Sequence, residues 1–354
     1  MAMALMSSEL YRQDLRACLD SVSGLEKLAG KSVLVTGAAG LLGSFLVDAL
    51  RLGNRERQLA CKIYASARSL ERLQGRFPVV EPVDNMKLLV QDVAQAWGYP
   101  DICPEYIIHA AGGADPRSMY EQPVEVIKAN VEGTGKMLEL LRQAGHGRLL
   151  YLSSGEVYGE TGNADALSEQ DFGHIDQASV RSCYPLSKRL AENLCLSYVH
   201  EYGVDAVVAR PAHTYGPTHT EKDSRATAQF ARQASSGEDI VLRSRGGQVR
   251  SYTYVADGVA GLLTVLLQGK AREAYNVADT SAQVSIADFA QLAAKAGGVA
   301  VRYEDNNSQP TPISRAVLSD KKLRALGWQP CFAPEEGIKH TVAIEKELFT
   351  KAQS

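Results

Sequence analysis

The sequence predicts an α/β protein in which a doubly wound parallel sheet is followed by a smaller C-terminal α/β lobe. Three observations predict this fold. Short apolar segments alternate with helical patterns over the first two thirds of the chain, a glycine-rich turn follows the first of these segments, and the pattern changes after Pro211. Such alternation is typical of right-handed βαβ units, whose parallel sheet is covered on both faces.

The expected strands are short and mostly apolar. The first, Lys31–Thr36 (KSVLVT), is apolar throughout its centre, as a buried parallel strand should be. The later strands are expected at Cys61–Ala67, Lys87–Gln91, Tyr106–His109, Arg148–Ser153 and Ala206–Ala209. Helical patterns connect them at Leu41–Leu52, Val124–Ala144 and Ser187–Glu201.

Residues 1–29 are expected to form an N-terminal helical extension. Apolar residues recur at helical spacing, which predicts an amphipathic helix over residues 7–29 (Leu10, Leu15, Leu19 and Val22). The segment lacks the basic start and long apolar run of a signal peptide. The sequence leaves open whether the apolar face packs on its own subunit or on a partner.

Composition excludes several classes of protein. The 354 residues carry 38 Lys and Arg against 41 Asp and Glu, a net charge of −3, so no basic excess favours nucleic-acid binding. With 45% hydrophobic residues the chain is not mostly disordered. No apolar run reaches the roughly 18 residues that would span a membrane, so we expect none to be crossed.

The six cysteines are scattered without a CxxC pair. Their spacing suggests neither zinc ligands nor a disulfide framework, so no metal site is expected. Free thiols are typical of a reducing compartment, and we expect a cytoplasmic protein.

A glycine-rich loop, Gly37-Ala-Ala-Gly40-Leu41-Leu42-Gly43, joins the first strand to the first helix. One glycine makes the tight turn, one lets the backbone approach a pyrophosphate, and one lets helix and strand pack closely. The phosphate would lie at the helix N-terminus, where free N–H groups and the dipole favour an anion. A purely structural turn is the disfavoured alternative, so the loop predicts a Rossmann-type dinucleotide site.

Two further positions bear on the dinucleotide. NAD enzymes usually place an acidic residue after the second strand to hold the adenosine ribose, but Ser66–Ser69 contains none. Arg68 would suit the 2′-phosphate of NADP or be a solvated surface charge, and both interpretations stay open. Asp92 and Val93 follow the third strand, where they would meet the adenine or cap the strand end.

Tyr184-Pro-Leu-Ser-Lys188 is the central catalytic motif. Residues at i and i+4 share one face of a helix. An ammonium near a phenol favours the phenolate, so we expect Lys188 to lower the pKa of Tyr184 from about 10. Tyr184 would then be a base for a substrate hydroxyl. This spacing alone also occurs by chance on surface helices.

A second polar motif, Ser153-Ser154-Gly155-Glu156, follows the fifth strand. Ligands of open α/β folds bind at the carboxyl edge of the sheet, where these residues lie. The Ser154 hydroxyl can bridge a substrate and Tyr184. Glu156 is a candidate acid–base catalyst, with a helix-start residue as the alternative.

These motifs together resemble the extended short-chain dehydrogenase/reductase family of NAD(P)-dependent sugar-nucleotide epimerases, dehydratases and decarboxylases. The resemblance spans residues 30–345 and adds further motifs: His109-Ala110-Ala111-Gly112, Asn130, Ser153–Gly159 and Tyr215-Gly-Pro217. It implies a Rossmann domain that holds the cofactor and a C-terminal lobe that holds a nucleoside-diphosphate sugar. It also implies a homodimer formed through a helix bundle.

The resemblance assigns roles to the motif residues. Tyr184 would be the base, Lys188 would bind the nicotinamide ribose, and Ser154 would hold the sugar hydroxyl. Ala110, Ala111 and Gly112 would contact the cofactor together with the glycine loop. The shared chemistry transfers a hydride from C4 of the sugar to the nicotinamide and so gives a 4-keto sugar. NAD is the expected cofactor, and NADP stays open because no acidic residue follows the second strand.

The domains expected on this basis are interleaved. Residues 30–210 and 252–278 would form the NAD(P)-binding domain. Residues 211–251 and 279–345 would form the sugar-nucleotide lobe, with a proline-punctuated loop near Gln309–Pro312.

The middle of the chain is most similar to UDP-glucuronate decarboxylases. The similar stretches are Ser168–His174, Arg181–Tyr184 and Gln248–Val255. By this similarity Arg250 would contact the nucleotide diphosphate, because a guanidinium fork suits phosphate. His213 stands where these enzymes usually carry Asn, and it would contact the sugar or be a loop histidine.

Departures from that pattern leave the reaction open. Ser154-Gly155-Glu156 replaces Thr-Ser-Glu, and Thr218 replaces an arginine. Glu156 favours chemistry at C5, whereas Gly155 favours plain epimerisation and cannot supply the acid of a 4,6-dehydratase. We therefore expect an enzyme most like a UDP-glucuronate decarboxylase. The alternatives are a UDP-sugar 4-epimerase, then a 4,6-dehydratase or keto-sugar reductase; the Tyr184/Lys188 pair disfavours a non-catalytic sensor.

Overall fold

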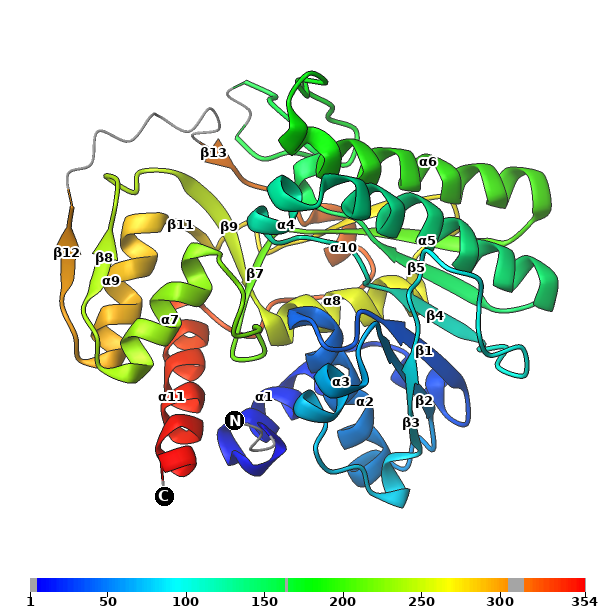
Figure 1. Cartoon of the computed structure of the whole chain (residues 1–354), viewed down its shortest axis with the longest axis horizontal. Coiled ribbons are helices and arrows are strands. Elements are labelled where there is room, and N and C mark those ends of the chain that lie inside the picture. The colour runs from blue at the N-terminus through cyan, green and yellow to red at the C-terminus, as the bar shows by residue number, and fades with distance from the viewer. Residues whose placement is uncertain (1–4, 163–164, 305–314, 354) are drawn as a thin grey trace.

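The structure, a computed structural model, describes residues 5–162, 165–304 and 315–353. Within these residues seven parallel strands form the main sheet in the order β10-β6-β5-β4-β1-β2-β3. Figure 1 labels β5, β4, β1, β2 and β3 of this sheet. The strands are β1 Ser32–Thr36, β2 Lys62–Ala67, β3 Met86–Val90, β4 Tyr106–His109, β5 Arg148–Leu152, β6 Asp205–Pro211 and β10 Ala274–Val277. The chain order reverses between β1 and β4, which confirms the predicted doubly wound sheet.

The two faces of the sheet bury different helices, because side chains alternate along a strand. On one face, Val33 and Val35 pack with helices α1, α2 and α8. On the other face, Leu34 packs with α5 and α6. These helices are α1 Glu9–Asp20, α2 Leu41–Arg57, α5 Pro123–Ala144, α6 Cys183–Tyr202 and α8 Val255–Gln268. The expected coverage of both faces is confirmed.

The predicted strands and helices of the first two thirds are all present, with shifted ends. Helix α2 continues five residues past its predicted end at Leu52. Helix α6 begins at Cys183 rather than Ser187, so Tyr184 lies inside its first turn. Strand β10 was not predicted and joins the main sheet beside β6. Shorter helices complete this part of the chain: α3 Leu70–Arg76 and α4 Pro116–Glu121.

The N-terminal extension packs on its own chain. Its described elements are the 3-10 turn Leu5–Ser7, α1, and the 3-10 turn Leu25–Leu28. The predicted helix over residues 7–29 is therefore wrong beyond Asp20, because the chain turns at Gly24, whose φ of +82° is left-handed. Helix α1 contacts α2, α8 and α11, and residues 1–4 lie outside the described residues.

The C-terminal lobe starts at the carboxyl edge of the sheet, since β7 follows β6 after one residue. Strand β9 pairs with β7, β11 and β13, and β8 pairs with β12. Helices α7, α9 and α11 pack against one another. The elements are β7 His213–Tyr215, α7 Ala226–Ser236, β8 Ile240–Leu242, β9 Val249–Tyr254, β11 Gln283–Ser285, α9 Ile286–Gly297, β12 Val301–Tyr303, β13 Arg315–Ala316, α10 Lys321–Arg324 and α11 Pro334–Gln353. The loop expected near Gln309–Pro312 lies outside the described residues.

Helices α1 and α11 bring the two ends of the described chain together. The Ser8 hydroxyl donates a hydrogen bond to Glu347 Oε2 at 2.6 Å, and the helices lie side by side (Figure 1).

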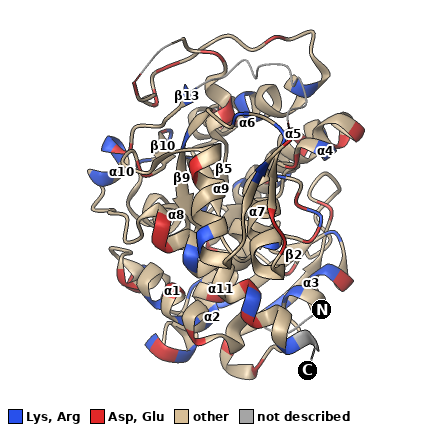
Figure 2. Cartoon of the chain, turned by 90° about the vertical axis from the view of Figure 1, so that its left-hand side faces the viewer, with Lys and Arg blue, Asp and Glu red and all other residues tan. Residues whose placement is uncertain are grey.

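Charged residues of both signs are interspersed on the helices. Figure 2 shows blue and red residues mixed along the outer elements on the side that it presents. Among the described residues, no helix combines the length and the apolar character needed to cross a membrane.

Candidate active site

The glycine loop forms a close-packed cradle between β1 and α2. Gly37 has a left-handed φ of +68°, and a Cβ there would lie 2.8 Å from backbone atoms of Ala110 and Ala111. A Cβ on Gly43 would lie 2.3 Å from the carbonyl oxygen of Gly37. Gly40 is the N-cap residue of α2, which begins at Leu41. The bare backbone of this loop therefore adjoins a helix N-terminus, where the first N–H groups lack intrahelical partners.

Polar groups line the point where β1 and β4 diverge. A Cβ on Gly112 would lie 2.5 Å from Asn130 Oδ1 and 3.2 Å from Lys188 Nζ. Asn130 Oδ1 and Ser153 Oγ are buried and have no hydrogen-bond partner among the described residues. Buried polar atoms of this kind suit a polar ligand, because leaving them unsatisfied costs free energy.

The residues predicted to contact the adenosine half of the cofactor follow β2 and β3, and they differ in exposure. Arg68 follows β2 and is exposed. The Asp92 carboxylate accepts the N–H of Ala94 at 3.0 Å, so it does cap the turn after β3. Val93 is buried, within reach of a Cβ built on Gly133. A contact of Asp92 or Val93 with adenine stays a prediction.

Lys188 lies one turn after Tyr184 on α6, and both side chains are buried. Lys188 Nζ donates to the carbonyl oxygen of Leu152 at 2.6 Å and lies 5.7 Å from the centre of the Tyr184 ring. Burial disfavours the ammonium and lowers the pKa of Lys188 to about 7.

The prediction that Lys188 lowers the pKa of Tyr184 is wrong for the protein without a bound cofactor. Burial, and next the charge of Glu156, raise the pKa of Tyr184 to about 12. Hydrogen bonding to Ser154 and the charges of Arg225 and Arg181 act in the opposite direction. The physical reason is that burial penalises the charged phenolate more than the nearby positive charges favour it.

Ser154 and Glu156 lie in the turn after β5. Ser154 Oγ accepts the Glu156 N–H at 3.1 Å and caps the 3-10 turn Gly155–Tyr158. The Glu156 carboxylate makes a bidentate ion pair with Arg181, at 2.7 and 2.9 Å. A Cβ on Gly155 would lie 3.1 Å from Leu318 Cδ1, so a side chain from the C-terminal lobe fills this space.

His213 and Arg250 come from paired strands of the C-terminal lobe. His213 lies on β7, opposite Tyr252 of β9, and Arg250 lies two residues before Tyr252. The surrounding protein, and next Arg250, lower the pKa of His213, although the ring reaches solvent. The charge of Glu156 influences the pKa values of Tyr184, His213 and Arg250.

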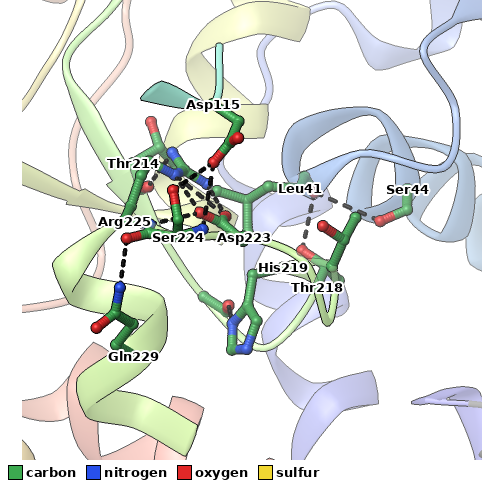
Figure 3. A network of polar contacts seen from close by, with 12 residues as sticks. Leu41, Ser44, Asp115, Thr214, Thr218, His219, Asp223, Ser224, Arg225 and Gln229 are labelled. Carbon is green, nitrogen blue, oxygen red and sulfur yellow. Dashed lines mark hydrogen bonds and ion pairs between the residues drawn. The ribbon is translucent and has the colours of Figure 1, made fainter. Parts of the chain in front are cut away.

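Arg225 was not predicted from the sequence, although its charge acts on Tyr184. It forms a bidentate ion pair with Asp223, and its Nη1 donates to the carbonyl oxygen of Thr214 at 3.5 Å (Figure 3). The neighbouring Ser224 bonds to Asp115, which follows β4. These residues lie in a segment without a periodic pattern, so only the fold brings them to the site.

The described residues fit a nicotinamide dinucleotide. The glycine cradle leaves room for a pyrophosphate, while Asn130 Oδ1, Ser153 Oγ and Lys188 Nζ offer acceptors and a donor for ribose hydroxyls and the nicotinamide amide. No group of three or more His, Cys, Asp or Glu residues in the described ranges is placed to hold a metal ion.

Solved structures share this fold. The UDP-glucose 4-epimerase of Thermus thermophilus, in complex with NAD, matches with a TM-score of 0.76 and 26% identity, covering 89% of this chain and 99% of that chain. An epimerase from Methanothermobacter thermautotrophicus matches with a TM-score of 0.80 and 22% identity, covering 95% and 97% respectively. The second likeness concerns the fold alone.

Curated relatives and a family model cover most of the chain. UDP-glucuronic acid decarboxylase 1 of Xenopus tropicalis is 32% identical over 330 residues, which are 92% of this chain and 74% of that protein. UDP-glucuronic acid decarboxylase 6 of Arabidopsis thaliana is 31% identical over 310 residues, 86% of each protein. The model of the NAD dependent epimerase/dehydratase family matches residues 33–278. The predicted resemblance and the predicted class of enzyme are thereby confirmed, and this chain belongs to the NAD dependent epimerase/dehydratase family.

Proposed function

We propose that the protein retains NAD and converts a UDP-hexuronate into a UDP-pentose and CO2 through a 4-keto intermediate, as a UDP-glucuronate decarboxylase. The observation that carries the proposal is the cluster of Tyr184, Ser154 and Lys188 beside the glycine cradle. Likeness to UDP-glucuronic acid decarboxylases over 92% of the chain supports this substrate and reaction.

Tyr184 is the proposed base for the sugar 4-hydroxyl, and Ser154 holds the same hydroxyl. A phenol with a pKa of about 12 stays almost entirely protonated at neutral pH and so cannot accept a proton, and additional positive charge is needed beside it to form the phenolate. NAD, when bound, would supply the hydride acceptor for C4 and a positively charged nicotinamide ring that favours the phenolate. Lys188 and Asn130 would hold the nicotinamide ribose, one as donor and one as acceptor.

Glu156 is the proposed group for the chemistry at C5. Oxidation at C4 makes the C6 carboxylate a β-keto acid, so the C5–C6 bond breaks, CO2 leaves and the electron pair remains as an enolate. C5 must then take a proton, and Tyr184 would return its proton to the C4 oxygen when the ketone is reduced. Because Arg181 binds both carboxylate oxygens of Glu156 and fixes the orientation of the side chain, we assign Glu156 to orienting the water that protonates C5.

Arg250 and His213 are the proposed contacts for the nucleotide sugar. Arg250 carries a guanidinium that suits the diphosphate, and His213 on the paired strand is exposed and so accessible to a sugar. Burial lowers the pKa of Arg250, so a bound anion would relieve the cost of its charge.

A UDP-sugar 4-epimerase is the second candidate. Gly155 favours it, because the position carries no side chain that could act as an acid. The same glycine disfavours 4,6-dehydration, and Leu318 already occupies the adjoining space. An epimerase would return the hydride to the opposite face of the sugar without loss of carbon.

NAD is the proposed cofactor, with NADP as the alternative. Arg68 is exposed, so its charge can be solvated by water, as in an NAD enzyme, or can bind the 2′-phosphate of NADP. Nucleotide released by denaturing the purified protein, identified by mass spectrometry, decides between them.

The function is tested by incubating the purified protein with UDP-glucuronate, UDP-glucose, UDP-N-acetylglucosamine and dTDP-glucose, without added cofactor. We expect mass spectrometry to detect loss of CO2 from UDP-glucuronate, and we expect Tyr184→Phe to reduce the rate by at least about a hundredfold. Tyr198→Phe on the same helix is the matched control and should retain the rate. Epimerised UDP-sugar without CO2 would favour the second candidate, and conversion of none of the four would contradict both.

We also propose a homodimer formed through α5 and α6. Both helices expose large apolar side chains, including Val124 at 58%, Ile127 at 43% and Leu190 at 54% of their accessible surface. A second copy that covers this face would bury them.

The proposed compartment is the cytoplasm. All six cysteines lie in the described residues and are free thiols, and Cys18, Cys61, Cys183 and Cys195 are buried. A reducing compartment keeps such thiols unpaired.

A further inference from the structure

The segment 216–225, called the clasp below, forms hydrogen bonds to both sides of the crevice between β1 and β4. One side is the start of α2, and the other is the loop after β4. At one end, Thr218 Oγ1 donates to the carbonyl oxygen of Leu41, the first residue of α2, at 2.8 Å. At the other end, Ser224 Oγ and N donate to Asp115 Oδ1 at 2.7 and 3.2 Å. Figure 3 shows the clasp running between these two contacts.

The clasp is held by hydrogen bonds within itself and by hydrogen bonds from α7. The N–H of Asp223 donates to the carbonyl oxygen of Thr220 at 3.0 Å, and Arg232 Nη2 donates to the carbonyl oxygen of Asp223 at 2.6 Å. Gln229 Nε2 donates to the carbonyl oxygen of Ser224 at 2.6 Å. Because Arg232 and Gln229 belong to α7, the clasp and this helix are held together as one unit.

The two anchors belong to the two halves of the doubly wound sheet. Leu41 lies at the end of the glycine loop that follows β1, and Asp115 lies in the loop that follows β4. The crevice between these loops is where open α/β sheets bind dinucleotides. A segment bonded to both loops therefore bridges the opening through which such a ligand enters and leaves.

We propose that Thr218, Ser224 and Asp115 are positioning residues that fasten the clasp over the bound dinucleotide and set the rate at which it is released. The inference rests on the proposed function in one respect, namely that the dinucleotide is the redox partner of the reaction. A sugar oxidised at C4 must be reduced by the same cofactor molecule, so release between the two steps would strand the keto intermediate. The clasp also carries Arg225, whose charge lowers the pKa of Tyr184, so fastening it maintains that charge beside the base.

The experiment measures release of the fluorescent reduced cofactor NADH from the loaded protein, chased with excess NAD in a stopped-flow instrument. Ser224→Ala removes a hydroxyl bond to a carboxylate and should speed release about tenfold. Thr218→Val removes a neutral bond with little change of shape and should speed it about fivefold. Thr218 and Ser224 anchor opposite ends of the clasp and share no hydrogen-bond partner, so the double variant should release NADH faster than either single variant.

Matched variants separate the clasp from general damage to the fold. Ser236→Ala removes a hydroxyl that donates to Gln233 in the same lobe but outside the clasp, and it should release NADH at the wild-type rate. Ser224→Thr retains the hydroxyl and should restore slow release. Circular dichroism of each purified variant reports whether that variant is folded.

The outcomes distinguish the two proposals. Release from Ser224→Ala, Thr218→Val and the double variant within twofold of wild type would overturn the clasp, with the proposed function intact. Ser224→Thr releasing as fast as Ser224→Ala would overturn the role of the hydroxyl. A wild-type protein that binds no dinucleotide would overturn the proposed function, and the clasp with it.

Discussion

At the residue scale, Lys188 couples the site to the stability of the chain. Its ammonium group is buried against the carbonyl oxygen of Leu152, and burial lowers its pKa from 10.5 to about 7. Between those values the unfolded chain binds a proton that the folded chain does not. The free energy of unfolding therefore rises with pH across this window.

We predict that this titration is visible without cofactor. From pH 7 to pH 9 the wild-type free energy of unfolding should rise by about 2 kcal/mol relative to that of Lys188→Met, which has no amine to titrate. Urea unfolding at pH 7, 8 and 9 measures it. Lys136→Met replaces an exposed lysine and should track the wild type. If the wild-type and Lys188→Met curves stay parallel, Lys188 is not desolvated in the way described.

The glycine loop shows which parts of the site a sequence reveals. Gly37, Gly40 and Gly43 were found because their spacing is local, although the atoms that exclude a Cβ from Gly37 belong to Ala110 and Ala111 after β4. Arg225 was missed because its approach to Tyr184 depends on how a non-periodic segment crosses the sheet edge. The Glu156–Arg181 ion pair was missed for the same reason, since 25 residues separate its partners.

At the element scale, helix α1 is fixed to the chain by a buried acid. Asp14 is 1% exposed and accepts a hydrogen bond from the Tyr254 hydroxyl at 2.5 Å. Its other oxygen lies 2.7 Å from His340 Nδ1. One carboxylate thus joins the N-terminal extension to β9 and to α11.

We predict that Asp14→Ala lowers the free energy of unfolding by about 2–4 kcal/mol, because it leaves a buried hydroxyl and an imidazole without their partner. Urea denaturation measures the loss. Glu9→Ala on the same helix removes exposed ion pairs with Arg12 and Arg16 and should cost much less than Asp14→Ala. Equal costs for the two variants would contradict the buried role of Asp14.

The same contact has a pH signature. Hydrogen bonding to Asp14 raises the pKa of His340 above 6.5, so its contribution to stability is full below pH 6.5 and is lost as pH rises through the folded value. The Asp14→Ala variant should lack this loss.

The elements themselves were predictable where the chain is periodic or uniformly apolar. Strand β4 was placed at its observed ends because Tyr106–His109 is short, apolar and bounded by polar residues. The N-terminal helix was predicted too long, because the apolar spacing continues through the 3-10 turn Leu25–Leu28 although Gly24 has already redirected the chain. Strand β10 was missed because its pairing with β6 spans more than sixty positions of sequence.

At the scale of the whole molecule, the exposed face of α5 and α6 is the feature that bears on assembly. We predict that the wild type is a dimer by light scattering and that Leu190→Glu converts it to a monomer, because the charge cannot be buried in an apolar interface. Val83→Glu, which alters an exposed apolar residue 49% accessible near the start of β3, should remain dimeric. A wild-type monomer at micromolar concentration would contradict the proposed interface.

The contact between α1 and α11 also means that the order of the elements along the chain could be changed by circular permutation. Since Ser8 and Glu347 touch, a linker of modest length between the two ends would close the backbone into a ring without disturbing either helix. The ring could be reopened at an exposed turn such as residues 236–238. A circular permutant of this kind would carry α1 and α11 as consecutive internal helices.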